Sequence, residues 1–430
     1  MKTHFNILFC FLSITSFLWG QNFDANWIGH FSYLNIKKVV NADTKFYAAS
    51  ENALFSYDLQ TNRLSTITTI NGLSGELIST LHYSNEYQLL MIGYENGLIE
   101  VYSENDQEVL KVVDIVNKVT IPSSQKKINH FNELNSLVYI ATDYGISVYN
   151  LESLEFGDSY YIGANGSQIQ VSQTAIFNNE IYAACGSNSG IKKASLSNSN
   201  LTDFQLWSSL GSGDFKAVTV FDSGLYTVNS ANTLFEINGT TLTLLSNYSQ
   251  PVAELNTSNN SLLVTTNSKV YEYELGFTLT NTYSTNPDFD TNFNAALKID
   301  AVVYIGTTDY GVLKSNPLDP SGFDEIHPIG PLKNTVFSLS HGYGNLWVSY
   351  GDYSIGFNPY PLRYYGISNY ENSEWVNTSY DSIRDTTGAP VSSLNRISIN
   401  TFNPNQVYIS SYHHGLLDFK KGESITLLDD

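Results

Sequence analysis

The sequence predicts an all-β fold: a seven-bladed β-propeller followed by the start of a second propeller. Apolar and polar residues alternate with a period of two in short runs that end in turn residues, which is typical of strands. No window of helical length shows a convincing 3.6-residue apolar period. A hairpin motif recurs about every 40 residues, and this is the spacing of one four-stranded propeller blade.

Each copy of the motif has two or three β-branched or aromatic residues, a small pair, a turn and a second short apolar strand. The seven copies before residue 320 lie at 46–57, 90–101, 138–149, 181–191, 225–237, 262–273 and 303–313. A twisted four-stranded sheet cannot bury both of its faces alone, so such sheets stack radially against their neighbours. A β-sandwich is the alternative fold, but two packed sheets would not produce seven near-equal copies.

Small residues close the first strand of most copies, and we expect them to let the inner strands crowd the propeller axis. The clearest pairs are Ala48-Ala49, Ala141-Thr142 and Gly306-Thr307. Glycines then stand where consecutive strands turn, and we expect a positive φ at these positions. The turn glycines are Gly97, Gly145, Gly190 and Gly311.

The pattern changes after about residue 316, where the segment 316–322 is rich in turn-forming residues and indicates a boundary. Two more copies of the motif follow, at 346–351 and 407–417. We expect a signal peptide at 1–20, an N-terminal seven-bladed β-propeller at 21–320, and a linker with an incomplete second β-propeller at 321–430. Two blades cannot close a ring and would expose their edges. We therefore expect the front part of a longer protein, or a truncated gene product.

The N-terminus has the pattern of a secretory signal peptide. A short basic start with Lys2 precedes an apolar run from Phe5 to Trp19, and the small residue Gly20 marks the expected cleavage site. The run is shorter than the roughly 20 apolar residues of a membrane-spanning helix. We expect an exported protein that passes through the periplasm to the outer membrane or cell surface.

The composition excludes several classes of protein. The chain has 21 Lys and Arg against 41 Asp and Glu, and its net charge of −20 argues against nucleic acid as a partner. A hydrophobic content of 42% excludes a disordered chain. Only 14% of the residues are charged, below the roughly 25% of ordinary soluble domains. We expect a surface rich in Tyr, Asn, Ser and Thr, which suits contacts with partner proteins or glycans.

No catalytic, cofactor-binding or metal-binding residue is predicted, and we expect no enzyme activity. Once Cys10 leaves with the signal peptide, Cys185 has no cysteine partner, and its apolar neighbours indicate a core strand. The eight histidines lack the HExxH spacing of a zinc site. His413 and His414 are adjacent, so in an extended chain they point to opposite faces and cannot bind one ion together.

Three further motifs fall short of a site. The segment 186–190 looks like a nucleophile elbow, but its central residue is Asn188 rather than Ser, so we expect a hairpin loop. The segment 288–292 has oxygen ligands at alternate positions, as a calcium loop does, but Phe293 and Ile299 stand where Gly and an acid are needed. We expect the adjacent basic pairs to be solvated in blade loops. These pairs are Lys37-Lys38, Lys126-Lys127, Lys192-Lys193 and Lys420-Lys421.

Several segments resemble known propeller families. The segment 71–78, Asn-Gly-Leu-Ser-Gly-Glu-Leu-Ile, resembles the inter-blade signature of two-component-regulator propellers. Another set of segments is similar, in order, to the PorZ-like family, cell-surface components of the Bacteroidetes type IX secretion system. These segments are 92–97, 126–130, 142–146, 160–163, 346–348 and 409–417. The similarity runs over nearly the whole chain after the signal peptide.

This resemblance implies two seven-bladed propellers and a C-terminal β-sandwich domain that carries a secretion signal. It also implies a non-enzymatic scaffold role in protein secretion and cargo attachment, with the sortase PorU and the proteins PorV and PorQ as partners. The family is associated with anionic lipopolysaccharide, and we expect any such contact in the C-terminal domain, which has no counterpart in these 430 residues. No functional residue is carried over, because the propeller has no catalytic motif to match. The alternative function is a periplasmic sensor or glycan-binding propeller of a two-component regulatory system.

Overall fold

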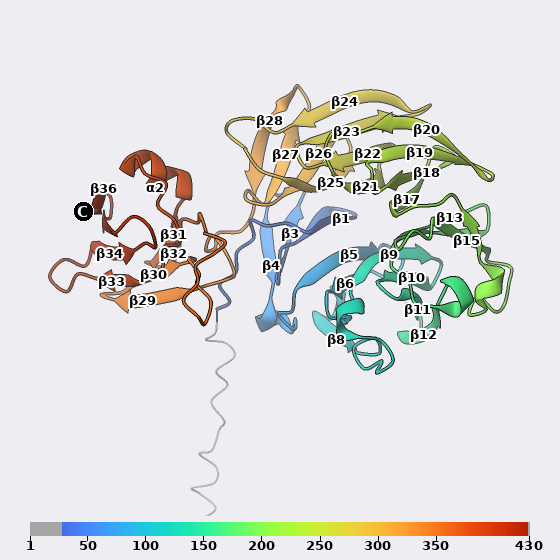
Figure 1. Ribbon diagram of the computed structural model, residues 1–430, viewed down its shortest axis with the longest axis horizontal. Helices are drawn as coiled ribbons and strands as arrows, with labels where there is room; N and C mark the ends of the chain where they lie inside the picture. The colour runs from blue at the N-terminus through green and yellow to red at the C-terminus, as the bar shows by residue number, and fades with distance from the viewer. Residues whose placement is uncertain (1–27, 429–430) are drawn as a thin grey trace, which may run out of the picture.

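The computed structural model describes residues 28–428, and the predicted signal peptide lies outside the described residues. Nearly all of the regular structure is β. Strands β1 to β36 form nine four-stranded antiparallel sheets, and within each sheet the strands pair in chain order (Figure 1). The predicted all-β propeller fold is therefore confirmed.

Seven sheets form a ring, and their strands are as follows. Sheets 1 and 2 contain β1 (Lys38–Ala42), β2 (Lys45–Ala49), β3 (Leu54–Asp58) and β4 (Leu64–Ile67), then β5 (Ile78–Ser84), β6 (Leu89–Tyr94), β7 (Ile99–Ser103) and β8 (Glu108–Val112). Sheets 3 and 4 contain β9 (Ile128–Leu134), β10 (Leu137–Thr142), β11 (Gly145–Asn150) and β12 (Glu155–Tyr160), then β13 (Val171–Phe177), β14 (Glu180–Cys185), β15 (Ile191–Ser195) and β16 (Ser208–Leu210). Sheets 5 and 6 contain β17 (Phe215–Phe221), β18 (Gly224–Asn229), β19 (Thr233–Asn238) and β20 (Thr241–Asn247), then β21 (Val252–Ser258), β22 (Ser261–Thr266), β23 (Lys269–Glu274) and β24 (Thr278–Ser284). Sheet 7 contains β25 (Phe293–Ile299), β26 (Val302–Thr307), β27 (Val312–Asn316) and β28 (Asp319–Ile326).

Two more sheets form what we call the second unit. They contain β29 (Ser338–Gly342), β30 (Asn345–Ser349), β31 (Ile367–Glu371) and β32 (Glu374–Thr378), then β33 (Ile397–Ile399), β34 (Gln406–Ser410), β35 (Leu416–Lys420) and β36 (Ser424–Leu428). The short helices are η2 (Thr69–Asn71), η3 (Ser123–Gln125), η4 (Ala164–Gly166), η5 (Phe204–Leu206) and α2 (Tyr380–Thr387). No helix among the described residues is long and apolar enough to cross a membrane.

The helix α2 was not predicted from the sequence, because its eight residues are shorter than a window in which helical periodicity can be recognised. Its N-cap is Ser379, whose hydroxyl accepts a hydrogen bond from the Ser382 amide, and Gly388 ends it with a φ of 67°. Ile383 is its buried residue, and it packs into the apolar core between the two sheets of the second unit.

The hairpin turns follow the sequence prediction. The four turn glycines, Gly97, Gly145, Gly190 and Gly311, have φ values of 89°, 145°, 70° and 64°. All four values lie where a residue with a Cβ would be strained. The segment rich in turn-forming residues that begins at Asn316 does not end sheet 7, as was expected. The chain continues into β28 and leaves sheet 7 only after Ile326, beyond the expected boundary at 320.

The first strand of each sheet lines the axis of the ring. Each of these strands packs against the first strand of the next sheet, and β25 of sheet 7 packs against β1 of sheet 1, so the ring is closed. Figure 1 shows this arrangement, with the seven sheets fanned around a common centre. The apolar cores lie between neighbouring sheets, as where Phe46 of sheet 1 meets Tyr304 of sheet 7 with ring centroids 4.9 Å apart.

The small residues of the motif lie on the second strand of each sheet, so the expectation that they crowd the axis was wrong. They allow neighbouring sheets to approach each other. A Cβ on Gly306 of β26 would lie 2.7 Å from Ile36 Cγ2 in sheet 1, and a Cβ on Gly93 of β6 would lie 2.7 Å from Ile128 Cγ2 in sheet 3. Both distances are shorter than van der Waals contact, so glycine is needed for this packing.

Polar contacts also close the ring between sheets 7 and 1. The Ile36 amide donates to Thr307 O at 2.8 Å, and Asn294 Nδ2 donates to Ile36 O at 2.9 Å. Lys38 of β1 forms an ion pair with Glu254 of β21, and the other carboxylate oxygen of Glu254 accepts from the Ala296 amide at 2.8 Å. These contacts link sheets 6, 7 and 1.

Replacement of Gly306 with Ala should destabilise the ring by about 1–3 kcal/mol, because the new methyl group would overlap Ile36 unless neighbouring sheets move apart. Gly157→Ala is the matched control. Gly157 lies in the outer strand β12, where a Cβ would be 3.4 Å from its nearest neighbour, Val148 O. Chemical denaturation followed by circular dichroism measures both variants, and equal stability of the two would contradict this account of the packing.

Glu272 of β23 should make the stability of the ring depend on pH. Its buried carboxylate binds Lys298 Nζ of β25 at 2.5 Å and accepts from Asn281 Nδ2 and Tyr283 Oη, each at 3.0 Å. Burial opposes ionisation, but these donors outweigh it and hold the pKa of Glu272 below its usual range. The stabilisation is therefore present above the unfolded-state pKa of about 4.3 and is lost as the pH falls through the folded-state value.

We expect Glu272→Gln to lower the free energy of unfolding by roughly 1–3 kcal/mol at pH 7, because the variant loses charge-assisted hydrogen bonds. The difference from the unmodified protein should shrink below about pH 4. Glu155→Gln, at an exposed position of β12, serves as the control and should change little at either pH. If the difference in unfolding free energy between Glu272→Gln and the unmodified protein stays constant down to pH 3, the proposed role of the Glu272 carboxylate is wrong.

Candidate functional site

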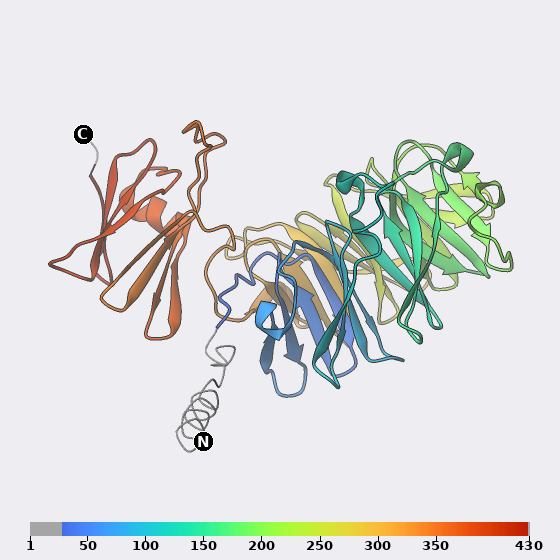
Figure 2. The same cartoon turned by 90° about the horizontal axis from the view of Figure 1, so that it is seen from below.

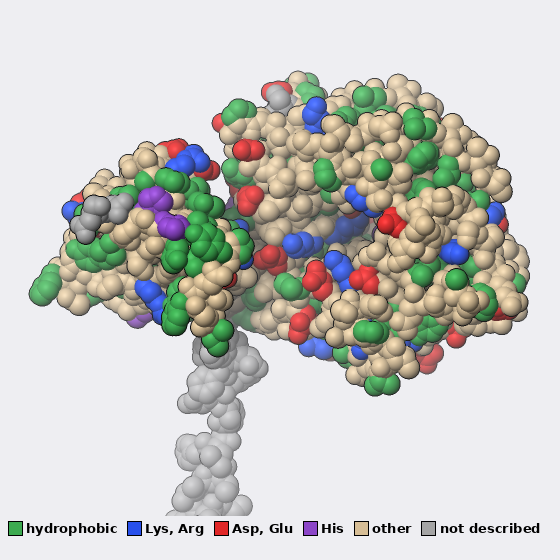
Figure 3. All heavy atoms as spheres, viewed as in Figure 1, with side chains coloured by type: hydrophobic (Ala, Val, Ile, Leu, Met, Phe, Trp, Pro, Cys, Tyr) green, Lys and Arg blue, Asp and Glu red, His purple; other side chains and the backbone are tan. Residues whose placement is uncertain are grey.

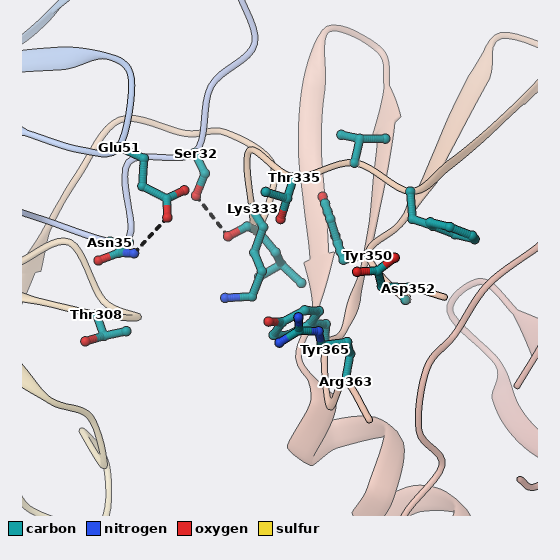
Figure 4. Close-up of a pocket in the computed structure, with 14 residues that line it drawn as sticks. Ser32, Asn35, Glu51, Thr308, Lys333, Thr335, Tyr350, Asp352, Arg363 and Tyr365 are labelled. Carbon is teal, nitrogen blue, oxygen red and sulfur yellow. Dashed lines mark hydrogen bonds between the residues drawn. The ribbon is translucent and has the colours of Figure 1, made fainter. Parts of the chain in front are cut away.

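A cleft of about 490 Å³ lies between the ring and the second unit (Figure 4). The ring contributes Asn35, Glu51 and Thr308, which lie before β1, after β2 and after β26. The second unit and the preceding linker contribute the opposite wall. Its main polar and aromatic residues are Lys333, Tyr350, Asp352, Arg363 and Tyr365.

Hydrogen bonds orient the ring side of the cleft. Asn35 Nδ2 donates to Glu51 Oε1 at 3.0 Å, and the second carboxylate oxygen of Glu51 has no hydrogen-bond partner among residues 28–428. The hydroxyl of Ser32 donates to Leu332 O at 2.9 Å, and so it is not positioned as a nucleophile beside a base. Figure 4 shows both bonds and the opposing wall of the second unit.

Aromatic rings shape the opposite wall. Tyr350 is buried, and its hydroxyl donates to Ser368 Oγ at 2.6 Å. Burial raises the pKa of Tyr350 to about 12, although the hydrogen bond with Ser368 opposes this shift, so the phenol is neutral at physiological pH. Lys333 Nζ lies 4.5 Å from the centre of the Tyr365 ring. This cation–π contact orients the Lys333 side chain over the ring.

The charges of the cleft are mixed. Lys333 and Arg363 supply two cations, and Glu51 and Asp352 supply two carboxylates. The backbone at Arg363 is held by Ser393, whose amide donates to Arg363 O at 2.6 Å. Two cations, two anions and two tyrosines can bind a polar segment of protein that carries both signs of charge.

Contacts beside the cleft join the ring to the second unit. The Ser32 amide donates to Asn334 Oδ1 at 2.7 Å, and Asn334 Nδ2 donates back to Ser32 O at 3.2 Å. Trp375 Nε1 donates to His30 Nδ1 at 3.1 Å. Burial lowers the pKa of His30, which keeps this nitrogen unprotonated and able to accept. Glycine at position 330 allows the linker to lie close to the backbone of Phe31, since a Cβ on Gly330 would lie 2.0 Å from Phe31 O.

A long loop between β30 and β31 projects from the second unit (Figure 2). We call residues 353–360 the apolar loop. Ile355 is fully exposed, and Phe357 and Tyr360 are 76% and 60% exposed. Hydrophobic side chains gather on this part of the second unit, whereas they are scattered over the ring face seen in the same view (Figure 3). A projecting set of large apolar side chains is typical of a protein contact surface.

The three residues singled out from the sequence for their chemistry lie in a core strand and a turn. Cys185 ends β14 as a free, buried thiol, and burial raises its pKa to about 12, so the prediction of a core residue is confirmed. His413 lies in the turn between β34 and β35, where its ring contacts Tyr412 and Tyr360. His414 is its neighbour in the same turn, with ring centroids 6.4 Å apart.

Two of the segments considered for a site lie between strands. The segment 186–190 is the turn between β14 and β15, as expected of a hairpin loop. The segment 288–292 lies between β24 and β25, where the Asp288 amide donates to Asn286 Oδ1 at 2.9 Å. Within residues 28–428, no group of three or more His, Cys, Asp or Glu residues could hold a metal ion.

The expectation that the basic pairs are solvated in loops was wrong for at least one member of each pair, and Lys192 and Lys420 also lie in strands, β15 and β35. Lys38 and Lys193 lie in strands and pair with Glu254 and Glu180. Lys126 is buried and donates to Val116 O at 2.6 Å, and Lys421 pairs with Glu371. Sequence spacing could not reveal these contacts, because the acceptors come from other strands or loops.

The chain is similar to known proteins in part of its sequence and in its fold. The protein-family model described as the N-terminal β-propeller domain of PorZ, of the type IX secretion system, matches residues 46–208. The search of curated proteins found no match. Among solved structures, the chain is similar to PorZ of Porphyromonas gingivalis, described as an essential bacterial surface component of the type IX secretion system of that organism.

The PorZ structure shares 16% sequence identity with this chain at a TM-score of 0.79, and the alignment covers 94% of this chain and 53% of that one. The chain therefore spans about half the length of that structure. A chain of the mitotic checkpoint complex also matches, at 12% identity and a TM-score of 0.48, over 65% of this chain and 85% of that chain. Residues 46–208 therefore match the family of PorZ N-terminal propeller domains, and the chain as a whole shares its fold with the PorZ structure.

Proposed function

We propose that this protein is a non-enzymatic component of a type IX secretion system. It acts at the cell surface as a scaffold for secretion and cargo attachment. The match of residues 46–208 to the PorZ propeller domain carries this proposal. The fold supports it, since the similarity to PorZ extends over 94% of the chain and so includes the second unit as well as the ring.

The proposed mode of action is protein contact. A closed ring of seven sheets is a rigid body whose loops can hold partners at constant positions. The cleft between the ring and the second unit offers both signs of charge beside tyrosine rings. The partners that we propose are the sortase PorU and the proteins PorV and PorQ, and the cleft with the adjacent apolar loop is the surface that we assign to them.

Deletion of the gene should leave cargo proteins unprocessed or retained in the periplasm, and the intact gene supplied in trans should restore their attachment to the surface. Immunoblots of periplasmic and surface fractions measure this outcome. Normal cargo attachment in the deletion strain would refute the proposed function. An altered transcriptional response with normal attachment would instead favour a sensor propeller of a two-component system.

Replacement of Ile355 and Phe357 together by Ser should weaken co-purification of the sortase complex, because the apolar loop would lose its two most exposed apolar anchors. We expect a reduction of roughly tenfold or more in recovered PorU, PorV and PorQ. The thermal midpoint should not change, since neither side chain packs in a core.

Leu275→Ser is the matched control for this loop. Leu275 is 66% exposed in the turn between β23 and β24 of the ring, so the variant removes a similar exposed apolar group from a different surface. Equal recovery of the complex with the loop variant, the control and the unmodified protein would exclude the apolar loop as the contact surface, whereas the deletion experiment would still test the function itself.

A further inference from the structure

The first strands of the ring share an irregularity at the same position. In six of the seven, the pairing with the second strand skips one residue near the start of the strand. The skipped residues are Ser79, Asn129, Ser172, Lys216, Ala253 and Asn294. In sheet 1 the equivalent residue is Lys37, which directly precedes β1 and whose amide donates to Ala49 O. A bulge turns a side chain out of the sheet, so these seven residues form one layer around the axis.

This layer lines a pocket of about 170 Å³ in the centre of the ring. Several members of the layer hold the ring together rather than facing a ligand. Ser79 Oγ donates to Ile128 O at 2.6 Å, and Asn129 Nδ2 donates to Val171 O at 2.9 Å. In each bond the acceptor is the backbone carbonyl of the first residue of the next sheet.

The next layer of residues forms polar bridges across the pocket. Lys38 of sheet 1 pairs with Glu254 of sheet 6, and Gln173 Nε2 of sheet 4 donates to Leu255 O of sheet 6 at 3.3 Å. Each bridge skips one sheet of the ring. Lys38, Glu254, Gln173 and Leu255 line the same pocket as the bulge layer.

The charges that line the pocket do not balance. Its charged residues are Lys37, Lys38, Lys216 and Glu254, which leave two positive charges while His130 is neutral. Glu254 is already paired with Lys38, and the bulge layer itself contains no carboxylate. In a chain of net charge −20, this is a local concentration of positive charge within a polar cavity.

Donors remain available in the pocket. Lys216 Nζ donates to Asn232 Oδ1 at 3.1 Å, which uses one of its three N–H groups. Lys37, an exposed residue that lines the pocket, and Ser172 have no side-chain hydrogen-bond partner among residues 28–428. The Nδ1 atom of His130 is buried and also has no partner among the described residues. Burial lowers the pKa of His130, and the nearby Lys38 and His82 lower it further, as expected in a positive environment.

We propose that this axial pocket binds a small oxyanion, a free phosphate or the carboxylate of a small molecule, between Lys37 and Lys216 with Ser172 beside them. A cavity of about 150 Å³ holds one benzene-sized molecule, so the pocket takes one small acid and excludes an oligosaccharide. The two ammonium groups come from sheets 1 and 5, on different sides of the ring. An oxyanion between them forms charge-assisted hydrogen bonds and balances the excess charge.

Isothermal titration calorimetry of the purified protein tests this proposal. Sodium phosphate and sodium acetate are titrated separately at constant ionic strength, with sodium chloride as the blank, so the two arms distinguish a phosphoryl from a carboxylate ligand. We expect one of the two to bind with a dissociation constant of about 1 mM or lower. The same anion should raise the thermal midpoint, because it binds the folded state only.

Lys37→Met and Lys216→Met should each weaken binding roughly tenfold, because each removes a charged donor. Lys269→Met, at an exposed position of β23 outside the pocket, should leave the affinity unchanged. Circular dichroism without anion establishes that the variants are folded. A crystal of the unmodified protein soaked in selenate adds a test that needs no variant, with an anomalous peak expected in the axial pocket.

Absence of binding by both anions at about 10 mM would overturn the proposal. So would an affinity that is unchanged in the folded double variant of Lys37 and Lys216, or selenate bound elsewhere on the molecule. Phosphate binding that is lost in these variants supports a phosphate site, and acetate binding with the same dependence supports a carboxylate site.

Discussion

Close packing between neighbouring sheets is the constraint on which the rest of this molecule depends. No single four-stranded sheet has a core of its own, because the apolar clusters of the ring lie between sheets, and the seventh sheet must meet the first. The distance between neighbouring sheets is set by small residues on the second strands. Examples are Gly93 and Gly306, whose neighbours leave no space for a Cβ. The axial pocket exists because this packing holds seven first strands around one centre.

Polar groups between the sheets give this packing its register. Ser79, Asn129 and Asn294 each bind the backbone of the following sheet, and Glu254 and Glu272 place carboxylates where a lysine of another sheet reaches them. A buried carboxylate is costly unless it is paired and hydrogen-bonded, so these residues favour one arrangement of the sheets over a sliding contact. The low content of charged residues is consistent with this role, because several of the charged side chains form ion pairs between sheets.

The second unit differs from the ring in the surface that it presents. Its two sheets share a core around Trp347 and Phe419, and its long loop between β30 and β31 forms one wall of the cleft and carries exposed apolar side chains. The repeat alone could not indicate this loop, because it interrupts the motif between the second and third strands of its sheet. The cleft was equally invisible in the sequence, since Glu51 and Arg363 lie far apart in the chain and line the same cleft only when the linker folds back on residues 30–35.

The sequence by itself determined the sheets: their number, their strand order, and the glycines at which consecutive strands turn. Those features depend on pairing between residues close in the chain, which a period of two and a turn residue record directly. Only the tertiary structure decided what the sheets do together. Lys38 and Glu254 are 216 residues apart, and of two adjacent lysines Lys38 forms an ion pair, whereas Lys37 is exposed and lines the axial pocket. The physical reason is that charge pairing and cavity lining depend on which strands share the axis, and local periodicity carries no record of that.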